Sequence, residues 1–133
     1  NQIERHPHYQ RMEELSVMKE LGIQVEGWAP FAEGLKGMFT EPVLQEIAEK
    51  HGKTVPQIIL RWDIQQNVVI IPKSVHQNRM EENLTIWDFE LDHEDMEKIA
   101  QLDKNVPSML DCSKPSEIDR LYDYLNNPVL TSL

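Results

Sequence analysis

The sequence is poor in the features on which extracellular and membrane-spanning proteins rely. Its single cysteine, Cys112, cannot form an internal disulfide and has no second thiolate with which to complete a zinc site. Apolar runs such as Val68–Ile71 are far shorter than the ~18 residues that a membrane-spanning helix needs, and no basic and apolar leader opens the chain. We therefore expect a cytoplasmic protein that is neither exported nor embedded in a membrane.

Positive charge is also scarce. Lys and Arg together number 13 against 23 Asp and Glu, which gives a formal net charge of −10. So acidic a surface is a poor partner for duplex nucleic acid or for an anionic membrane. A cation with a functional role must therefore act locally.

Apolar periodicity predicts short strands that alternate with amphipathic helices in one domain of 133 residues. The expected strands are 1–4, 23–26 and 68–71. The expected helices are 10–21, 42–52, 54–66, 80–87 and 92–100, with a last one between Pro115 and Pro128. This alternation is typical of an α/β fold whose parallel strands are joined by right-handed crossovers.

Several local patterns sharpen these expectations. Thr54 and Gln57 have the spacing of a capping box, and Asp92 is suited to cap the helix that follows it. The strand 68–71 is continuously apolar, which is typical of a strand covered on both faces. Two apolar stripes predict buried helix faces, the second on a C-terminal arm packed against the body: Met12, Leu15, Met18 and Leu21, and Ile118, Leu121, Tyr122 and Leu125.

Three parallel strands make an incomplete sheet, because the unpaired groups at both edges must be covered or paired. The chain also opens on Asn1 rather than Met, within what reads as the end of a strand. We therefore expect a part of a larger protein, or an obligate assembly.

The stretch Ile70–Arg79 is the most informative for function, since it holds two cations and no acid in an otherwise acidic chain. It follows a predicted strand, and ligands of parallel α/β folds bind at the carboxyl ends of strands, where helix N-termini attract anions. Lys73, Ser74 and Arg79 therefore form a candidate phosphate cradle. The alternative is a solvated loop whose cations only balance Glu81 and Glu82.

A second candidate is Trp28, in the loop after the preceding strand, where an aromatic ring can stack on a planar ligand. The alternative is a core tryptophan. His6 and His8 lack a third ligand at a recognisable spacing, so we expect a structural role for them and no metal site.

These segments together resemble the C-terminal half of an aldo-keto reductase. The resemblance is carried by the motifs Asn1-Gln2-Ile3-Glu4-Arg5-His6-Pro7, Trp28-Ala29-Pro30-Phe31 and Ile71-Pro72-Lys73-Ser74 with Arg79, Glu82 and Asn83. It implies part of a (β/α)8 barrel, from the end of the sixth strand through strands seven and eight. Residues 1–133 would be a single partial domain, with 106–133 as its C-terminal arm.

The resemblance also implies an NADPH-dependent oxidoreductase that acts on aldehydes or ketones, and roles for individual residues. Gln2 would bind the nicotinamide carboxamide, Trp28 would stack on the nicotinamide ring, and backbone near Phe31 would approach the pyrophosphate. The adenosine 2′-phosphate would be held by Lys73, Ser74 and Arg79, with Val75 beside them and Glu82 and Asn83 near the adenine. The bottom-up phosphate cradle and this implied site coincide, which favours NADP over NAD.

Two departures from the family pattern qualify this assignment. Glu33 stands in the loop near the expected pyrophosphate, where its charge is repulsive unless it turns away, for example toward Lys36. The family's catalytic Asp, Tyr, Lys and His precede the part that this chain resembles. None of Tyr9, Tyr122, Tyr124 or Lys73 matches them, and Cys112 is expected to be an inert thiol.

We therefore expect an enzyme whose catalytic residues lie outside this chain and whose substrate is a small carbonyl compound. Alone, the chain is expected to self-associate or to need the missing half of the barrel. The alternative is a non-catalytic truncated barrel that binds nucleotide or serves as a self-assembling interaction unit.

Overall fold

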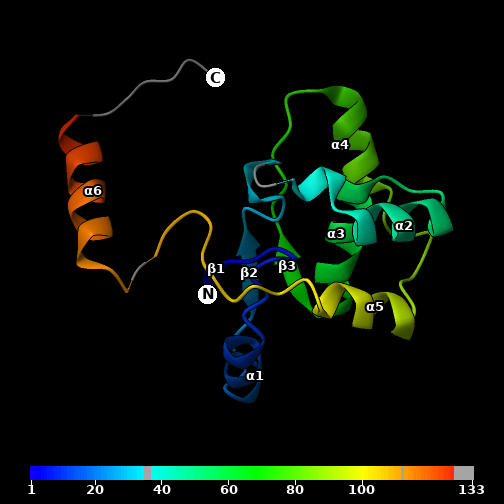
Figure 1. Cartoon of the computed structure of the whole chain (residues 1–133), viewed down its shortest axis with the longest axis horizontal. Coiled ribbons are helices and arrows are strands. Elements are labelled where there is room, and N and C mark those ends of the chain that lie inside the picture. The colour runs from blue at the N-terminus through cyan, green and yellow to red at the C-terminus, as the bar shows by residue number, and fades with distance from the viewer. Residues whose placement is uncertain (35–36, 112, 128–133) are drawn as a thin grey trace.

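The computed structural model describes residues 1–34, 37–111 and 113–127. The described chain alternates strands with helices, as expected (Figure 1). The elements are β1 (Gln2–Glu4), α1 (Met12–Glu20), β2 (Val25–Trp28), the 3-10 turns η1 (Ala32–Gly34) and η2 (Met38–Thr40), α2 (Pro42–His51), α3 (Val55–Gln65), β3 (Val68–Ile70), α4 (Gln77–Leu84), α5 (His93–Ala100) and α6 (Pro115–Asn126).

The strands form one parallel sheet in the order β1-β2-β3. Ile3 is in register with Gly27, and Gly27 with Ile70, so all three strands end at the same edge. A Cβ atom on Gly27 would lie 3.3 Å from Cγ1 of Val68, which explains why the middle strand carries a glycine at this point. The parallel sheet predicted from the alternation is confirmed.

The two faces of the sheet differ. One face buries Ile3, Val25 and Val68 against Met18 of α1. The other face carries Gln2, Glu26, Trp28 and Val69, since side chains alternate along a strand. The expectation that 68–71 is covered on both faces is wrong for the described residues, in which Val69 is 41% and Ile71 51% exposed.

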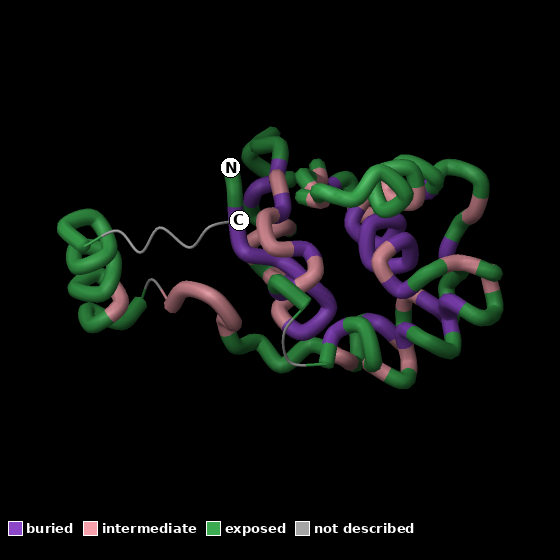
Figure 2. Tube along the Cα trace, turned by 90° about the horizontal axis from the view of Figure 1, so that it is seen from above, coloured by how far each residue is buried: buried purple, intermediate pink, exposed green. Residues whose placement is uncertain are grey.

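The main core lies between α2, α3 and α5, which pack beside the sheet (Figures 1 and 2). The local signals that predicted these helices are confirmed. Thr54 N donates to Oε1 of Gln57 at 3.0 Å, and Asp92 and Asp95 form a reciprocal box at the start of α5. Lys50 on α2 reaches both of these aspartates, which ties α5 to α2.

The sheet and the helix layer are joined by a buried cation. The Arg5 guanidinium, just after β1, pairs with Asp63 on α3 and lies 3.9 Å from the centre of the Trp62 ring. Its Nε donates to the carbonyl of Gln10 at 2.9 Å. Burial lowers the pKa of Arg5 to about 9, against the opposing effect of the Asp103 carboxylate, and the side chain therefore stays charged at neutral pH.

The apolar side chains of two helices are less buried than their spacing suggests. On α1 only Met18 is buried, whereas Met12 and Leu21 are 51% and 67% exposed. The helix expected over 80–87 begins at Gln77 and ends at Leu84, and Met80, Leu84 and Trp87 are all exposed. The patterns identify amphipathic helices, but α1 packs on the sheet only through Met18 and the partly buried Leu15, and the apolar side chains of α4 are exposed.

The C-terminal arm divides into two parts. Residues 107–111 return to the sheet, whereas α6 stands apart from the body and all four of its stripe residues are exposed (Figures 1 and 2). The expectation that this helix packs on the body is therefore wrong. Cys112 lies outside the described residues, as does the stretch 128–133. No helix in the described ranges is both long enough and apolar enough to cross a membrane.

These exposed apolar surfaces generate a prediction about assembly. An apolar groove of about 660 Å³ borders the open edge of β3. Its apolar lining includes Ile64, Val69, Met80, Leu84 and Trp87. Because such a groove and unpaired strand edges favour association, we expect the isolated chain to form oligomers at micromolar concentration. Light scattering after size exclusion measures this, and a monodisperse, folded monomer would contradict it.

Candidate functional site: a cleft at the carboxyl ends of the strands

A cleft of about 940 Å³ opens where β2 and β3 end. Because the strands are parallel, the loops after them meet at this edge. Eight of the nine residues predicted for cofactor binding line it: Trp28, Phe31, Lys73, Ser74, Val75, Arg79, Glu82 and Asn83. Segments about 45 residues apart in sequence thus form a single concave surface.

The loop after β2 forms one wall of the cleft. Its backbone turns through left-handed conformations at Ala29, Ala32 and Glu33, with φ of 51°, 46° and 54°. Left-handed conformations are costly for residues other than glycine and often occur at ligand-binding loops. Trp28 lines the cleft and is only half-buried, which favours the stacking interpretation over a core tryptophan.

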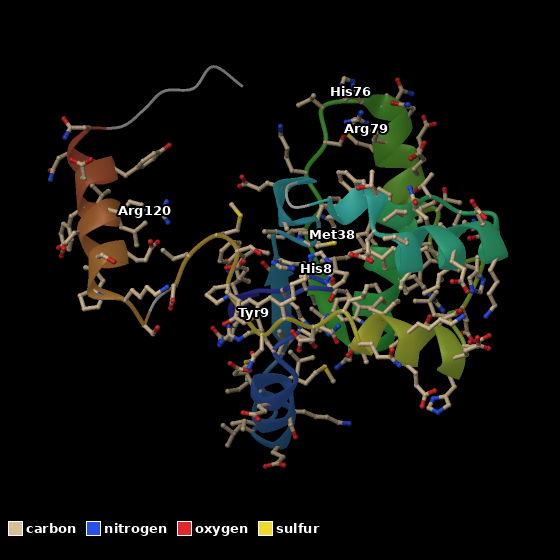
Figure 3. All side chains as sticks on the ribbon, viewed as in Figure 1. His8, Tyr9, Met38, His76, Arg79 and Arg120 are labelled. Carbon is tan, nitrogen blue, oxygen red and sulfur yellow. The ribbon has the colours of Figure 1, made fainter. Side chains whose placement is uncertain are left out.

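The opposite wall is the loop after β3 together with α4. Ser74 Oγ accepts from the backbone N–H of His76 at 3.1 Å, which shapes the loop just before α4 begins. His76 and Arg79 lie together at this end of the molecule (Figure 3). Within the described residues neither Lys73 nor Arg79 forms an ion pair with Glu81, Glu82 or another carboxylate. The two cations thus face the cleft with their charges available, which favours the phosphate cradle over a balanced solvated loop.

Gln57 holds α4 in place, a role that its sequence context does not reveal. Its Nε2 donates to the carbonyls of Glu82 and Thr85 at 3.1 and 2.9 Å, and its Oε1 accepts from Thr54 N at the start of α3. A single buried side chain therefore caps two helices. The capping-box spacing predicts only the contact with Thr54, because the contacts with Glu82 and Thr85 join segments 25 or more residues apart in sequence.

Gln2 does not line the cleft. It lies at the other end of β1 in register with Glu26, whose carboxylate accepts a hydrogen bond from the Gln2 amide. It nevertheless shares a sheet face with Trp28, two residues further along in register, or ~7 Å along the strand.

Two acidic residues, Glu33 and Glu82, line the cleft with the cations. Lys36, named above as a possible partner of Glu33, lies outside the described residues. The two N-terminal histidines each contact a glutamate at 3.2 Å: His6 contacts Glu4, which is close in sequence, whereas His8 contacts the distant Glu41. Within 1–34, 37–111 and 113–127, no three His, Cys, Asp or Glu side chains are grouped so as to hold a metal ion.

Comparison with known proteins finds relatives over most of this chain. Residues 1–104 match the sequence pattern of the aldo/keto reductase family. Glyoxal reductase of Bacillus subtilis is 49% identical over 105 residues, which cover 79% of this chain and 37% of that protein. Methylglyoxal reductase DkgA of Escherichia coli is 43% identical over 104 residues, which cover 78% of this chain and 38% of the relative.

Solved structures are similar as well. A Gox0644 mutant in complex with NADPH has a TM-score of 0.75 and 38% identity over 78% of this chain and 38% of that one. Bombyx mori aldo-keto reductase in complex with NADP has a TM-score of 0.77 and 33% identity over 85% of this chain and 39% of that one. The present chain therefore spans well under half the length of the proteins it matches.

The double contact of Gln57 generates a prediction about the cleft wall. Gln57→Ala would leave two partly buried carbonyls without their donor, at a cost of about 1–3 kcal/mol. We expect faster hydrogen exchange of the amides of α4 than in the unchanged chain, measured by mass spectrometry. Gln45→Ala, at an exposed position of α2, is the matched control and should leave this exchange unaltered. Equal protection of α4 in both variants would show that Gln57 does not hold the wall.

Proposed function

Because this chain belongs to the aldo-keto reductase family, we propose that the whole protein reduces aldehydes or ketones to alcohols with NADPH. The names of the relatives, glyoxal reductase and methylglyoxal reductase, support a small aldehyde or dicarbonyl compound as substrate. The NADPH and NADP held by the similar structures support the cofactor.

The observation that carries the proposal is the joint placement of Lys73, Arg79 and Trp28 around one cleft. The two unpaired cations and the Ser74 hydroxyl suit a phosphate, since hydrogen bonds between charged groups are shorter and stronger than neutral ones. The Trp28 ring offers a planar apolar surface to a planar ligand. A dinucleotide with an additional phosphate on its adenosine fits this combination of a phosphate cradle and an aromatic surface.

In this proposal the chain binds and orients the cofactor. Lys73, Ser74 and Arg79 hold the 2′-phosphate, with Val75 beside them, Glu82 and Asn83 near the adenine, and the backbone at Phe31 near the pyrophosphate. Trp28 fixes the plane of the nicotinamide, and Gln2, which shares that sheet face but does not line the cleft, is assigned to its carboxamide. When bound, the cofactor supplies the hydride. We assign no residue of this chain to protonation of the carbonyl oxygen.

The cofactor preference generates a test. Arg79→Ala and Lys73→Ala each remove a charged contact that NADPH has and NADH lacks. In the full-length protein we expect the dissociation constant for NADPH to rise about 10- to 100-fold, with less than about a threefold change for NADH. Fluorescence titration measures both constants.

Lys19→Ala is the matched control, because it removes an exposed lysine of α1 far from the cleft. It should leave both dissociation constants unchanged. Equal weakening of NADPH and NADH by Arg79→Ala would remove the 2′-phosphate assignment, although it would leave the family membership intact.

A second test concerns catalysis by the chain itself. Since we place the proton donor outside it, the purified 133-residue chain should show no oxidation of NADPH in the presence of methylglyoxal, followed at 340 nm. The full-length protein assayed in parallel should be active. Turnover by the chain alone would contradict our assignment of the chemistry to the remainder of the protein.

A further inference from the structure

The helix α4 carries three residues of the cleft but has little apolar packing against the rest of the chain. Glu82 and Asn83 lie three and four positions after Arg79, so the three residues share one face of α4, and all of them line the cleft (Figure 3). No residue of α4 is buried, and its apolar side chains Met80 and Leu84 are 45% and 73% exposed. Because few buried apolar contacts mean low local stability, α4 needs another attachment to hold a fixed position.

Hydrogen bonds from Gln57 supply this attachment. Within the described ranges, the hydrogen bonds that join α4 or its C-cap Thr85 to another element are the two that Gln57 Nε2 donates, to the carbonyls of Glu82 and Thr85 at 3.1 and 2.9 Å. The other hydrogen bonds of this helix stay within residues 76–85. Both acceptors belong to the last turn, where carbonyls have no partner inside the helix. Gln57 therefore satisfies this end of α4 and fixes it to α3.

Gln57 is itself held at the start of α3, which forms another part of the cleft. Its Oε1 accepts from Thr54 N at 3.0 Å, and its neighbours Val55 and Pro56 line the cleft. Gln57 is only 6% exposed and does not line the cleft. One buried amide thus joins two walls of the cleft, with its acceptor used on α3 and its donor on α4.

We propose that Gln57 is a positioning residue for cofactor selectivity, which fixes α4 so that the Arg79 guanidinium meets the adenosine 2′-phosphate. Gln57 acts through α4 and touches neither the cofactor nor the reacting atoms. Displacement of a charged donor by about 1 Å weakens its bond to a phosphate but leaves the contacts that NADPH and NADH share. Gln57 is therefore more important for NADPH than for NADH. This inference rests on the proposed function, since it takes the 2′-phosphate to lie beside Arg79.

The first test compares two glutamines of α3 in the full-length protein. Gln57→Met keeps the length of the buried side chain and removes its hydrogen bonds. We expect the dissociation constant for NADPH to rise about tenfold, with less than about a threefold change for NADH, both measured by fluorescence titration.

Gln65→Met is the matched control for this test. Gln65 lies at the other end of α3, and its side chain donates to the carbonyl of Leu91 at 2.9 Å and accepts from Leu91 N at 2.8 Å. Its loss should lower the Tm by a similar amount but leave the ratio of the two dissociation constants unchanged. A loss of selectivity of the same size in both variants, or in neither, would overturn the positioning role.

The second test asks whether Gln57 acts through Arg79, by means of a double-mutant cycle. If Gln57 places the guanidinium, Arg79→Ala should weaken NADPH by only about threefold or less in the Gln57→Met background, against about 10- to 100-fold in the unchanged protein. Independent, multiplying effects would overturn this inference and leave the proposed function standing. If the unchanged protein bound no NADPH, or if Arg79→Ala weakened NADPH and NADH equally, the 2′-phosphate assignment would fail and this inference with it.

Discussion

The structure depends on the buried ion pair between Arg5 and Asp63, because it joins the sheet to the helix layer at the edge where the cleft forms. Arg5 also lies over the Trp62 ring and donates to Gln10, so its charge is met by a carboxylate, an aromatic face and a carbonyl. Loss of one partner of such a pair costs about 3–5 kcal/mol, since the other charge is left buried and unpaired. The end of β1 is thereby fixed relative to α3, which leads directly into β3.

Two adjacent charged residues at the end of β1 serve opposite sides of the sheet. Arg5 is directed toward the helices, whereas Glu4 is directed toward the other face and the C-terminal segment, since successive side chains of a strand alternate. Both are fully buried, and both are satisfied by groups that are distant in sequence. The same strand end therefore anchors both the helix layer and the segment 108–110.

Sequence patterns predicted the features that depend on residues close to one another in the chain. The helix starts at Thr54 and Asp92 follow from capping, and the start at Pro42 follows from the fit of proline to the first turn of a helix. The phosphate cradle follows from two cations without an acid after a strand, and the cofactor roles of its residues stay predictions. Contacts between distant segments, such as Glu4 with 108–110 and Gln57 with α4, leave no local pattern. Burial of the stripes on α1, α4 and α6 was overestimated because periodicity indicates an apolar face but not whether the chain itself covers it.

The charges of the cleft determine how a dinucleotide would lie in it. Its lining carries two cations, Lys73 and Arg79, and two carboxylates, Glu33 and Glu82, so its formal charge is balanced in a chain of net charge −10. Attraction for a phosphate therefore depends on where the cations stand rather than on an excess of positive charge. Both belong to the wall after β3, whereas the wall after β2 offers Trp28 together with an acid. In our proposal, a phosphorylated adenosine is therefore favoured at α4 and a neutral or cationic ring at Trp28, which is in register with the last residue of β1.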